Sequence, residues 1–317
     1  MAEPSNPDAS PADDSGAASR NTAAVSRIDV LRTGWGEQHR EHRYGSWMPR
    51  LLWVLLSQSW IRLPVQAFVI HHRDGPVVFD TGLDPAIKTN PDYIKQRIGR
   101  LLLRRIFRLH IEERDALRYQ LEAAGVAPAS IRRAVISHLH FDHVGGIADI
   151  PNAELIVSDA EWAQLSEPHP EREWILREHI EIPGADWRPV QFQPSTDPLL
   201  QPFGGSFDVM GDGALTLIPT PGHTAGSSSL FIRSQGWPLI LLVGDLAYEP
   251  GLIWDGQPPG TGDAKTLRET YEKVRALRDA LPDLVVIASH DPEAPALIAK
   301  AAGDRPAGSP HMHEDLP

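Results

Sequence analysis

An apolar stretch that runs straight into metal-capable side chains constrains this chain of 317 residues more than any other feature. In the segment AVISHLHFDHVGG, an expected buried strand, Ala134–Ser137, leads directly into His138, His140, Asp142 and His143. Loops that follow strand ends are where α/β folds place their functional sites. Three imidazoles and a carboxylate in so short a loop are hard to explain by packing. They predict a metal site.

A short loop cannot surround a metal on all sides, so further ligands are expected at the ends of other strands. Three candidates each come just after an expected apolar strand: His223 after Leu215–Pro219, Asp245 after Leu239–Val243, and His290 after Leu284–Ala288. Taken alone, His223 or His290 could equally be structural. Together with the first cluster, the pattern favours a ligand role for all three.

The composition limits what such a site can be made of. The chain has 14 histidines and no cysteine, which excludes disulfides, a thiolate nucleophile and cysteine-based zinc or iron–sulfur sites. Imidazole and carboxylate ligands suit zinc, although iron, manganese or cobalt would also be accepted. The formal net charge of −12 argues against nucleic acid as the main partner, because neutralising phosphates needs a basic surface.

The two ends of the chain differ in composition from the middle. Residues 1–26 are poor in large apolar residues and predict a disordered acidic tail, and residues 302–317 predict a flexible C-terminal tail. No signal-like segment is found, and the longest apolar run, near Leu51–Leu56, is too short to span a bilayer. We therefore expect a cytoplasmic protein without stable membrane insertion. Residues 27–301, which show no linker or repeat, are expected to form a single domain.

Between the tails, short β-rich runs alternate with helical stretches, which predicts a layered α/β fold. Besides the strands named above, the expected strands are Ile28–Arg32, Val65–His71, Val77–Phe79, Glu154–Val157 and Ser229–Ile232. The expected helices are Asp92–Leu109, Asp115–Ala124, Glu161–Ser166, Glu171–His179, Ala264–Ala280 and Glu293–Ala301.

The stretch Asp92–Leu109 is unusual because apolar residues at helical spacing alternate with many basic ones. The pattern favours an amphipathic helix that packs on the body and turns a basic face to solvent. A lid or a dimer element beside the active site is the alternative, and a homodimer is compatible with the sequence. A membrane-surface role has little support from the pattern itself.

These motifs together resemble those of the metallo-β-lactamase-fold hydrolases. The matching segments are HLHFDH, PTPGHTAGS, LVGD, ASHD and VVFDTG, and the resemblance runs from about Ile28 to about Ala301. It implies a four-layer αββα sandwich with the site at one edge of the paired sheets. It also implies two zinc ions, the first on His138, His140 and His223 and the second on Asp142, His143 and His290, with Asp245 bridging them. Asp80 would support the site or serve a structural role rather than bind metal.

Two divalent metals ~3.5–4 Å apart can hold a shared hydroxide, lower its pKa and polarise a carbonyl or phosphoryl oxygen. Several branches of the fold fit this chain poorly. His140, where the iron redox branch has Glu, argues against that branch. Only 27 residues follow His290, which leaves out the C-terminal helical domain of glyoxalase II-like thioesterases. The 44 residues between Asp245 and His290 leave no room for the inserted domain of nucleic-acid-cleaving relatives.

The segment Asp245-Leu246-Ala247-Tyr248 is similar to N-acyl homoserine lactone lactonases, in which this tyrosine contacts the substrate carbonyl. The resemblance implies that Tyr248 donates a hydrogen bond to the developing oxyanion and that Asp142 passes a proton to the leaving alkoxide. Otherwise Tyr248 is an ordinary aromatic wall residue. An apolar groove for the acyl chain is expected from the Asp92–Leu109 helix and from Met48, Leu51, Leu52, Trp53, Leu55 and Trp60.

The function expected is therefore opening of a lactone, with an N-acyl homoserine lactone in quorum quenching as the expected substrate, by attack of the metal-bridging hydroxide. The alternative is an organophosphate or aryl-ester hydrolase, or another ester hydrolase, on the same site. A third hypothesis is a non-catalytic scaffold with structural metals. In either enzymatic case the partner is a small-molecule lactone or ester.

Overall fold

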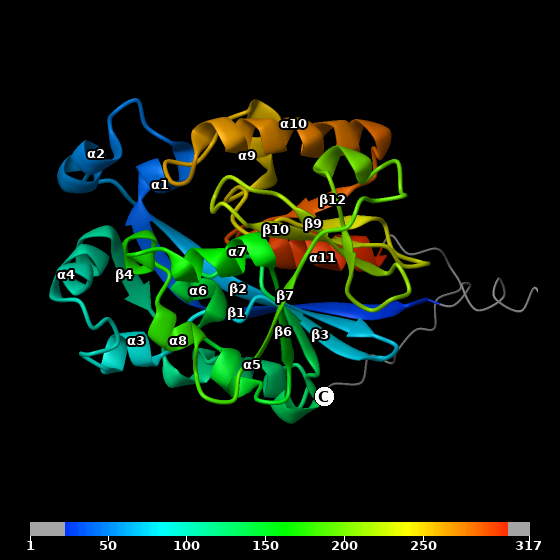
Figure 1. The fold of residues 1–317 in the computed structure, drawn as a ribbon, viewed down its shortest axis with the longest axis horizontal. Helices are drawn as coiled ribbons and strands as arrows, with labels where there is room; N and C mark the ends of the chain where they lie inside the picture. Colours follow the sequence, from blue (N-terminus) through cyan, green and yellow to red (C-terminus); the bar gives the residue numbers. More distant parts are fainter. Residues whose placement is uncertain (1–22, 304–317) are drawn as a thin grey trace, which may run out of the picture.

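The computed structural model describes residues 23–303, in which two β-sheets face each other and helices cover both outer sides (Figure 1). The first sheet has the spatial order β4 (Phe107–His110), β1 (Val25–His39), β2 (Trp60–His72), β3 (Gly75–Phe79), β5 (Arg133–Val135), β6 (Glu154–Ser158) and β7 (Asp186–Val190). The second has the order β12 (Val285–Ile287), β11 (Ile240–Leu242), β10 (Ser228–Ile232), β9 (Leu215–Pro219) and β8 (Phe207–Asp208).

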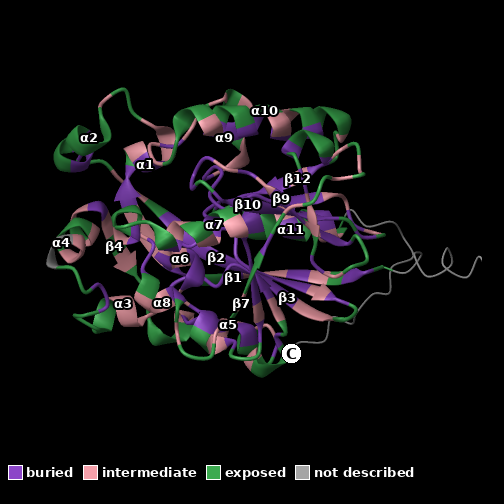
Figure 2. Ribbon diagram, in the orientation of Figure 1, coloured by how far each residue is buried: buried purple, intermediate pink, exposed green. Residues whose placement is uncertain are grey.

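Apolar side chains fill the space between the two sheets. Phe68, Phe79 and Val135 of the first sheet meet Leu217 and Leu230 of the second in one buried cluster. Central strands that are covered on both faces read as continuous apolar runs, and residues 63–70 of β2 are buried without alternation. Burial is concentrated on the strands, whereas the outer surfaces of the helices are exposed (Figure 2).

Helices close the sandwich on both sides. Leu117 and Leu121 of α5 (Leu117–Ala123) pack on the outer face of the first sheet, and Tyr271 of α10 (Ala264–Ala280) packs on the second. These four layers confirm the expected αββα architecture. The other helices are α1 (Arg40–Tyr44), α2 (Arg50–Leu56), α3 (Ala86–Thr89), α4 (Arg97–Ile106), α6 (Phe141–Val144), α7 (Asp159–Ala163), α8 (Arg177–Ile180), α9 (Pro250–Asp255) and α11 (Ala294–Gly303).

Each of the nine expected strands overlaps an observed one, and β9 and α10 have the expected bounds. The start of α10 is fixed by Asp263, whose side chain accepts a hydrogen bond from the backbone N–H of Thr266 at 2.7 Å. Strands β4, β7 and β8 were not expected. They are short or irregular in pattern, and each is held by pairing with a neighbouring strand.

The expected helix Asp92–Leu109 is wrong at both ends. The helix α4 begins only at Arg97, and at Phe107 the chain turns into β4, which pairs with β1 through Phe107 and Gln38. In β4 the side chains alternate between half-buried Phe107 and Leu109 and exposed Arg108 and His110, as a strand requires. Pairing with β1 therefore overrides the helical spacing.

The expected helix Glu171–His179 is also wrong, because Trp174 takes a left-handed conformation with φ 62° and separates a 3₁₀ turn from α8. The folded part of the chain extends further at both ends than the sequence predicted. Strand β1 begins at Val25, whose carbonyl accepts a hydrogen bond from Trp237 Nε1 at 2.9 Å, and α11 ends at Gly303. The rest of both expected tails, 1–22 and 304–317, lies outside the described residues.

Candidate metal centre

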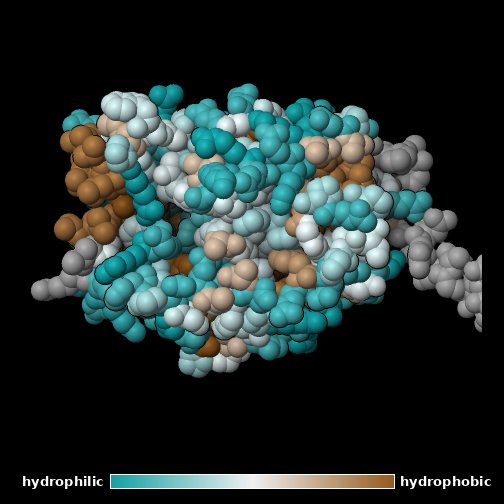
Figure 3. All heavy atoms as spheres, turned by 45° about the horizontal axis from the view of Figure 1, so that its top comes forward, coloured by the Kyte–Doolittle hydropathy of each residue, from teal (hydrophilic) through white to brown (hydrophobic). Residues whose placement is uncertain are grey.

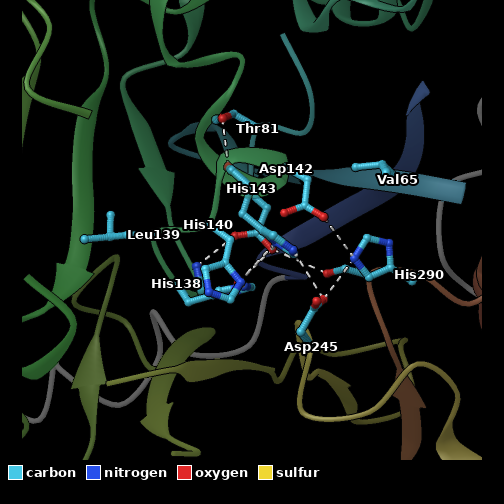
Figure 4. Close-up of polar contacts among 12 residues, drawn as sticks. Val65, Thr81, His138, Leu139, His140, Asp142, His143, Asp245 and His290 are labelled. Atoms are coloured by element: carbon cyan, nitrogen blue, oxygen red, sulfur yellow. Dashed lines mark hydrogen bonds and ion pairs between the residues drawn. The ribbon is translucent and has the colours of Figure 1, made fainter. Parts of the chain in front are cut away.

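Four loops at one edge of the sandwich bring the seven predicted ligand residues together, and Figure 4 labels all of them except His223. The loop after β5 carries His138, His140, Asp142 and His143, while His223, Asp245 and His290 follow β9, β11 and β12. In Figure 4, the side chains of Asp142, Asp245 and His290 converge on the histidines, whereas Leu139 points away into the protein.

His138, His140 and His223 form a first grouping whose ring nitrogens lie within 4.8 Å of one another. The Nδ1 atom of His140 is 3.0 Å from Nε2 of His138 and 3.1 Å from Nε2 of His223. Three imidazoles at this spacing are the donor set typical of a zinc site.

Asp142, His143 and His290 form a second grouping. Asp142 Oδ2 is 3.6 Å from His290 Nε2. The carboxylate of Asp245 lies between the two groupings: its Oδ1 is 3.2 Å from His290 Nε2 and 3.3 Å from His143 Nε2, and its Oδ2 is 3.5 Å from His223 Nε2. One side chain thus faces both sets of nitrogens.

Asp80 orients the second grouping from behind. It lies at the end of β3 with φ 57°, and its side chain accepts hydrogen bonds from the Ser137 backbone N–H at 2.7 Å and from His143 Nδ1 at 2.8 Å. His290 Nδ1 likewise donates to the carbonyl of Pro64 at 2.8 Å. In both imidazoles the Nδ1 atom is engaged by the protein, so Nε2 is directed into the centre. This arrangement supports the predicted supporting role for Asp80.

Glu161 connects the two loops of the first grouping and was not singled out from the sequence. It is fully buried, and its carboxylate accepts hydrogen bonds from Leu139 N at 2.9 Å, Thr224 Oγ1 at 2.6 Å and Gly226 N at 3.1 Å. Gln164 Nε2 also donates to it. Leu139 stands between His138 and His140, and Thr224 follows His223, so one carboxylate holds the backbone on both sides of these ligands.

Two glycines let the histidine loop approach the loop after β3. A Cβ on Gly145 would come within 2.3 Å of the Asp84 nitrogen, and one on Gly146 within 2.5 Å of the Thr81 carbonyl. Thr81 in turn donates from Oγ1 to the His143 carbonyl at 2.9 Å. The close contact between the two loops therefore explains why the motif has glycine at both Gly145 and Gly146.

The electrostatics of the first grouping favour neutral imidazoles. Burial lowers the pKa of His140 and of His223 to about 3, and burial together with His143 lowers the pKa of His138 well below its usual value. Neutral imidazole is the form that binds a metal.

The second grouping behaves differently. Burial would lower the pKa of His143 and His290, but the Asp245 carboxylate raises both. Burial would raise the pKa of Asp245, but His290 and His143 hold it well below its usual value. A divalent cation would take the place of the protons that these groups attract.

Three buried atoms of the candidate ligands have no hydrogen-bond partner among the described residues: His143 Nε2, His223 Nδ1 and Asp245 Oδ1. Buried polar atoms normally have such a partner, so a nitrogen and a carboxylate oxygen that lack one and face each other at 3.3 Å, as His143 Nε2 and Asp245 Oδ1 do, fit a metal ion. The donor set of nitrogens and oxygens suits zinc and other first-row divalent metals.

The centre forms the floor of a pocket of about 600 Å³. Tyr248 lines this pocket, with its ring 5.5 Å from the ring of His290 at an interplanar angle of 30°. Burial and the nearby Asp245 and Asp142 carboxylates raise the pKa of Tyr248 far above its usual value, so its hydroxyl stays protonated. It is therefore a hydrogen-bond donor across the working pH range.

The apolar wall of the pocket differs from the expected groove. Val54, Ile106, Phe107, Phe141 and Trp174 line it. Of the residues expected there, Leu51, Leu52 and Leu55 instead point to solvent, and Trp53 is buried inside the α2 region. After Arg50 every residue of α2 is apolar, so its sequence does not distinguish the face that packs inward from the face exposed to solvent.

The family model of the Metallo-beta-lactamase superfamily matches residues 60–290. The chain belongs to this superfamily. Its candidate His and Asp ligands are those of a metal-dependent hydrolase fold. Among residues 23–303, no helix combines the length and the hydrophobicity needed to cross a bilayer.

Named members of the superfamily are similar over most of the chain. The N-acyl homoserine lactonase AttM of Rhizobium radiobacter is 31% identical over 246 residues, which are 75% of this chain and 86% of that protein. An N-acyl homoserine lactonase of Bacillus cereus is 27% identical over 70% of this chain and 79% of its own. A solved N-acyl homoserine lactone hydrolase with N-hexanoyl-L-homoserine at its metal centre has the same fold, with a TM-score of 0.68, 20% identity and coverage of 85% of this chain and 95% of its own.

Proposed function

We propose that this protein is a metal-dependent hydrolase that opens the lactone ring of N-acyl homoserine lactones, a quorum-quenching activity. The observation that carries the proposal is the pair of His/Asp groupings joined by Asp245 at the floor of the pocket, with Tyr248 beside them. The similarity to proteins named N-acyl homoserine lactonase, at up to 31% identity, supports the choice of substrate. A cytoplasmic location remains part of the proposal.

In this proposal two zinc ions bind to the seven side chains. His138, His140 and His223 hold the first ion, and Asp142, His143 and His290 hold the second. The carboxylate of Asp245 serves both, in keeping with its position between the groupings. When bound, divalent metals of this kind supply a water of lowered pKa and a Lewis acid for the substrate carbonyl.

The remaining steps fall to the side chains around the ions. Tyr248 keeps its proton and donates a hydrogen bond to the carbonyl oxygen as negative charge develops there. Asp142 is the partly exposed carboxylate of the floor, with a side chain 20% accessible, so it can take the proton that the attacking water loses and pass it to the departing ring oxygen. The opened product is an acyl homoserine with a free carboxylate and a free hydroxyl.

The apolar wall of the pocket can accommodate the acyl chain of the substrate. Val54 of α2, Ile106 of α4 and Phe141 present apolar side chains to the same pocket as Tyr248. A pocket of about 600 Å³ falls within the ~300–1,000 Å³ range of small-molecule sites. A lactone ring on the floor and an acyl chain along this wall use the pocket's polar and apolar sides together.

The proposal is tested by following acid release from purified, zinc-loaded protein with a series of acyl homoserine lactones of increasing chain length. Ring opening should be seen with several chain lengths, and the His140→Ala variant should lose it. Equal acid release by the wild type and by His140→Ala would reject the proposal. Hydrolysis of aryl esters or aryl phosphotriesters without hydrolysis of lactones would assign the same centre to a different substrate class.

A further inference from the structure

An exposed apolar surface stands at one end of the molecule, on α2, on α4 and on the loop before α2. Seven of the eight large hydrophobic residues that are exposed in the described part of the chain lie here: Trp47, Leu51, Leu52, Leu55, Leu56, Leu101 and Leu102. We call these seven residues the apolar cap. They form the brown area at the left of Figure 3, over the helices α2 and α4 of Figure 1. Monomeric proteins rarely expose contiguous apolar patches beyond roughly a few hundred Å². The cap therefore indicates a surface that binds a partner.

The cap is built into the fold. Below it, Trp53, Val54 and Ile106 are buried in one cluster that joins α2 to α4. The Arg105 side chain of α4 donates to the carbonyl of Leu55 at 2.6 Å and also contacts the carbonyl of Ser57 at 3.3 Å. These bonds fix the end of α2, so the exposure of its leucines is set by the packing beneath them.

Basic residues stand next to the cap residues on α2 and α4, although the whole chain is acidic with a net charge of −12. Arg50 begins α2, and Arg104 stands on α4 one turn from Leu101. Lys95 precedes α4 and is exposed. Neither Lys95 nor Arg104 forms an ion pair with another described residue, so both charges remain available to an outside partner. An apolar patch bordered by free cations is complementary to an anionic lipid surface.

We propose that the apolar cap docks this protein onto an anionic membrane surface. Trp47 has an exposed fraction of 93% and stands beside the leucines, and tryptophan favours the boundary between lipid headgroups and acyl chains. The leucines insert among the acyl chains, while Arg104 and Lys95 meet the headgroup phosphates. A second copy of this chain fits less well, because a symmetric contact centred on the cap would bring the same cations face to face.

The inner face of the same module lines the pocket. Arg50 and Val54 of α2 and Ile106 of α4 line it, one helix thickness from the cap. Docking would therefore place the pocket close to the lipid. One consequence rests on the proposed function: lactones with long acyl chains, which partition into bilayers, would reach the pocket from the membrane side.

Vesicle pelleting with the full-length, metal-loaded protein tests the docking without any turnover. The protein should pellet with phosphatidylcholine vesicles that contain phosphatidylglycerol, and much less with phosphatidylcholine alone. The double variant Leu51→Glu with Leu55→Glu should bind at least about tenfold more weakly, because two exposed leucines that would insert among the acyl chains are replaced by charges. Tyr119→Glu is the matched control, since Tyr119 is the exposed large hydrophobic residue outside the cap, and it should bind like the wild type.

The electrostatic part has its own pair of variants. Lys95→Glu with Arg104→Glu should weaken binding to the phosphatidylglycerol vesicles and reduce its salt dependence, whereas Lys265→Glu on the exposed face of α10 should not. All these positions are exposed, so thermal unfolding should be unchanged and serves as the folding control.

Two results would overturn the proposal. The first is wild-type binding to the anionic vesicles that is no stronger than that of the Leu51→Glu, Leu55→Glu variant. The second is a wild-type dimer in light scattering without lipid that the same variant converts to a monomer, which would assign the cap to a second copy. Neither result depends on lactone turnover, so both are distinct from a failure of the proposed function.

Discussion

The floor and the wall of the pocket are built in opposite ways. The floor consists of polar side chains from four separate loops, and further hydrogen bonds hold several of them, such as His143 by Asp80 and the His138 loop by Glu161. The wall includes Val54 of α2 and Ile106 of α4, two helices that are separated in the chain by β2 and β3 but pack against each other and carry exposed leucines on their outer side. We infer that the strand ends position the candidate ligands, while the helices at the rim would contact the acyl chain, the part of the substrate that varies.

The largest effect is expected from Asp245, the one carboxylate that faces both groupings. Asp245→Ala should lower lactone hydrolysis roughly a thousandfold or more, because metal stabilisation of developing charge is worth several kcal/mol. It should also lower the metal content of both positions in mass spectrometry. His140→Ala should deplete one position only. Equal losses of metal in the two variants would contradict a role for Asp245 at both metal positions.

The next effect concerns the donor above the floor. Tyr248→Phe removes a hydroxyl that burial keeps protonated, and it should lower kcat about 10²- to 10³-fold with little change in metal content. Steady-state kinetics on a short-chain lactone measures this. A variant with wild-type kcat would make Tyr248 a wall residue and remove it from the chemistry.

A smaller effect tests how the floor is held in place. Glu161→Ala leaves the donors of Leu139, Thr224 and Gly226 without their buried acceptor, which should cost about 1–3 kcal/mol of stability. Metal affinity should fall about 10- to 100-fold, as is typical when a residue that supports metal ligands is removed. Competition with a chelator measures the affinity, and denaturant unfolding measures the stability. Exposed Glu167→Gln is the control and should change neither.

The smallest effect belongs to the wall. Ile106→Ala shortens an apolar side chain in the pocket and should raise KM for long-chain lactones about 10-fold while leaving short-chain substrates nearly unchanged. Leu101→Ala, on the outer side of the same helix, should leave both values as they are. If both chain lengths lose activity equally, the wall does not select the acyl chain.

The same contrast explains what could be predicted from sequence. The floor was predictable because each ligand directly follows an apolar run, and strand ends meet at a common edge of the sandwich. Glu161 was not, because its partners Leu139 and Gly226 lie 22 and 65 positions away and no local pattern marks a carboxylate that joins two loops.

The wall was the hardest part to predict. The helical spacing of Asp92–Leu109 could not show that Phe107 leaves the helix to pair with β1, because that pairing depends on a strand far away in the sequence. Nor could the apolar run Leu51–Leu56 show which of its side chains would face solvent. Both features follow from tertiary packing rather than from local preference.

The most direct test of a two-metal lactonase is a titration of metal-free protein with zinc, in which opening of an N-acyl homoserine lactone is followed at each addition. Activity should rise until about two equivalents per chain are bound and then stay constant, and His140→Ala should gain none over the same range. Full activity at one equivalent, or ring opening that does not depend on zinc or any other divalent metal, would contradict this prediction.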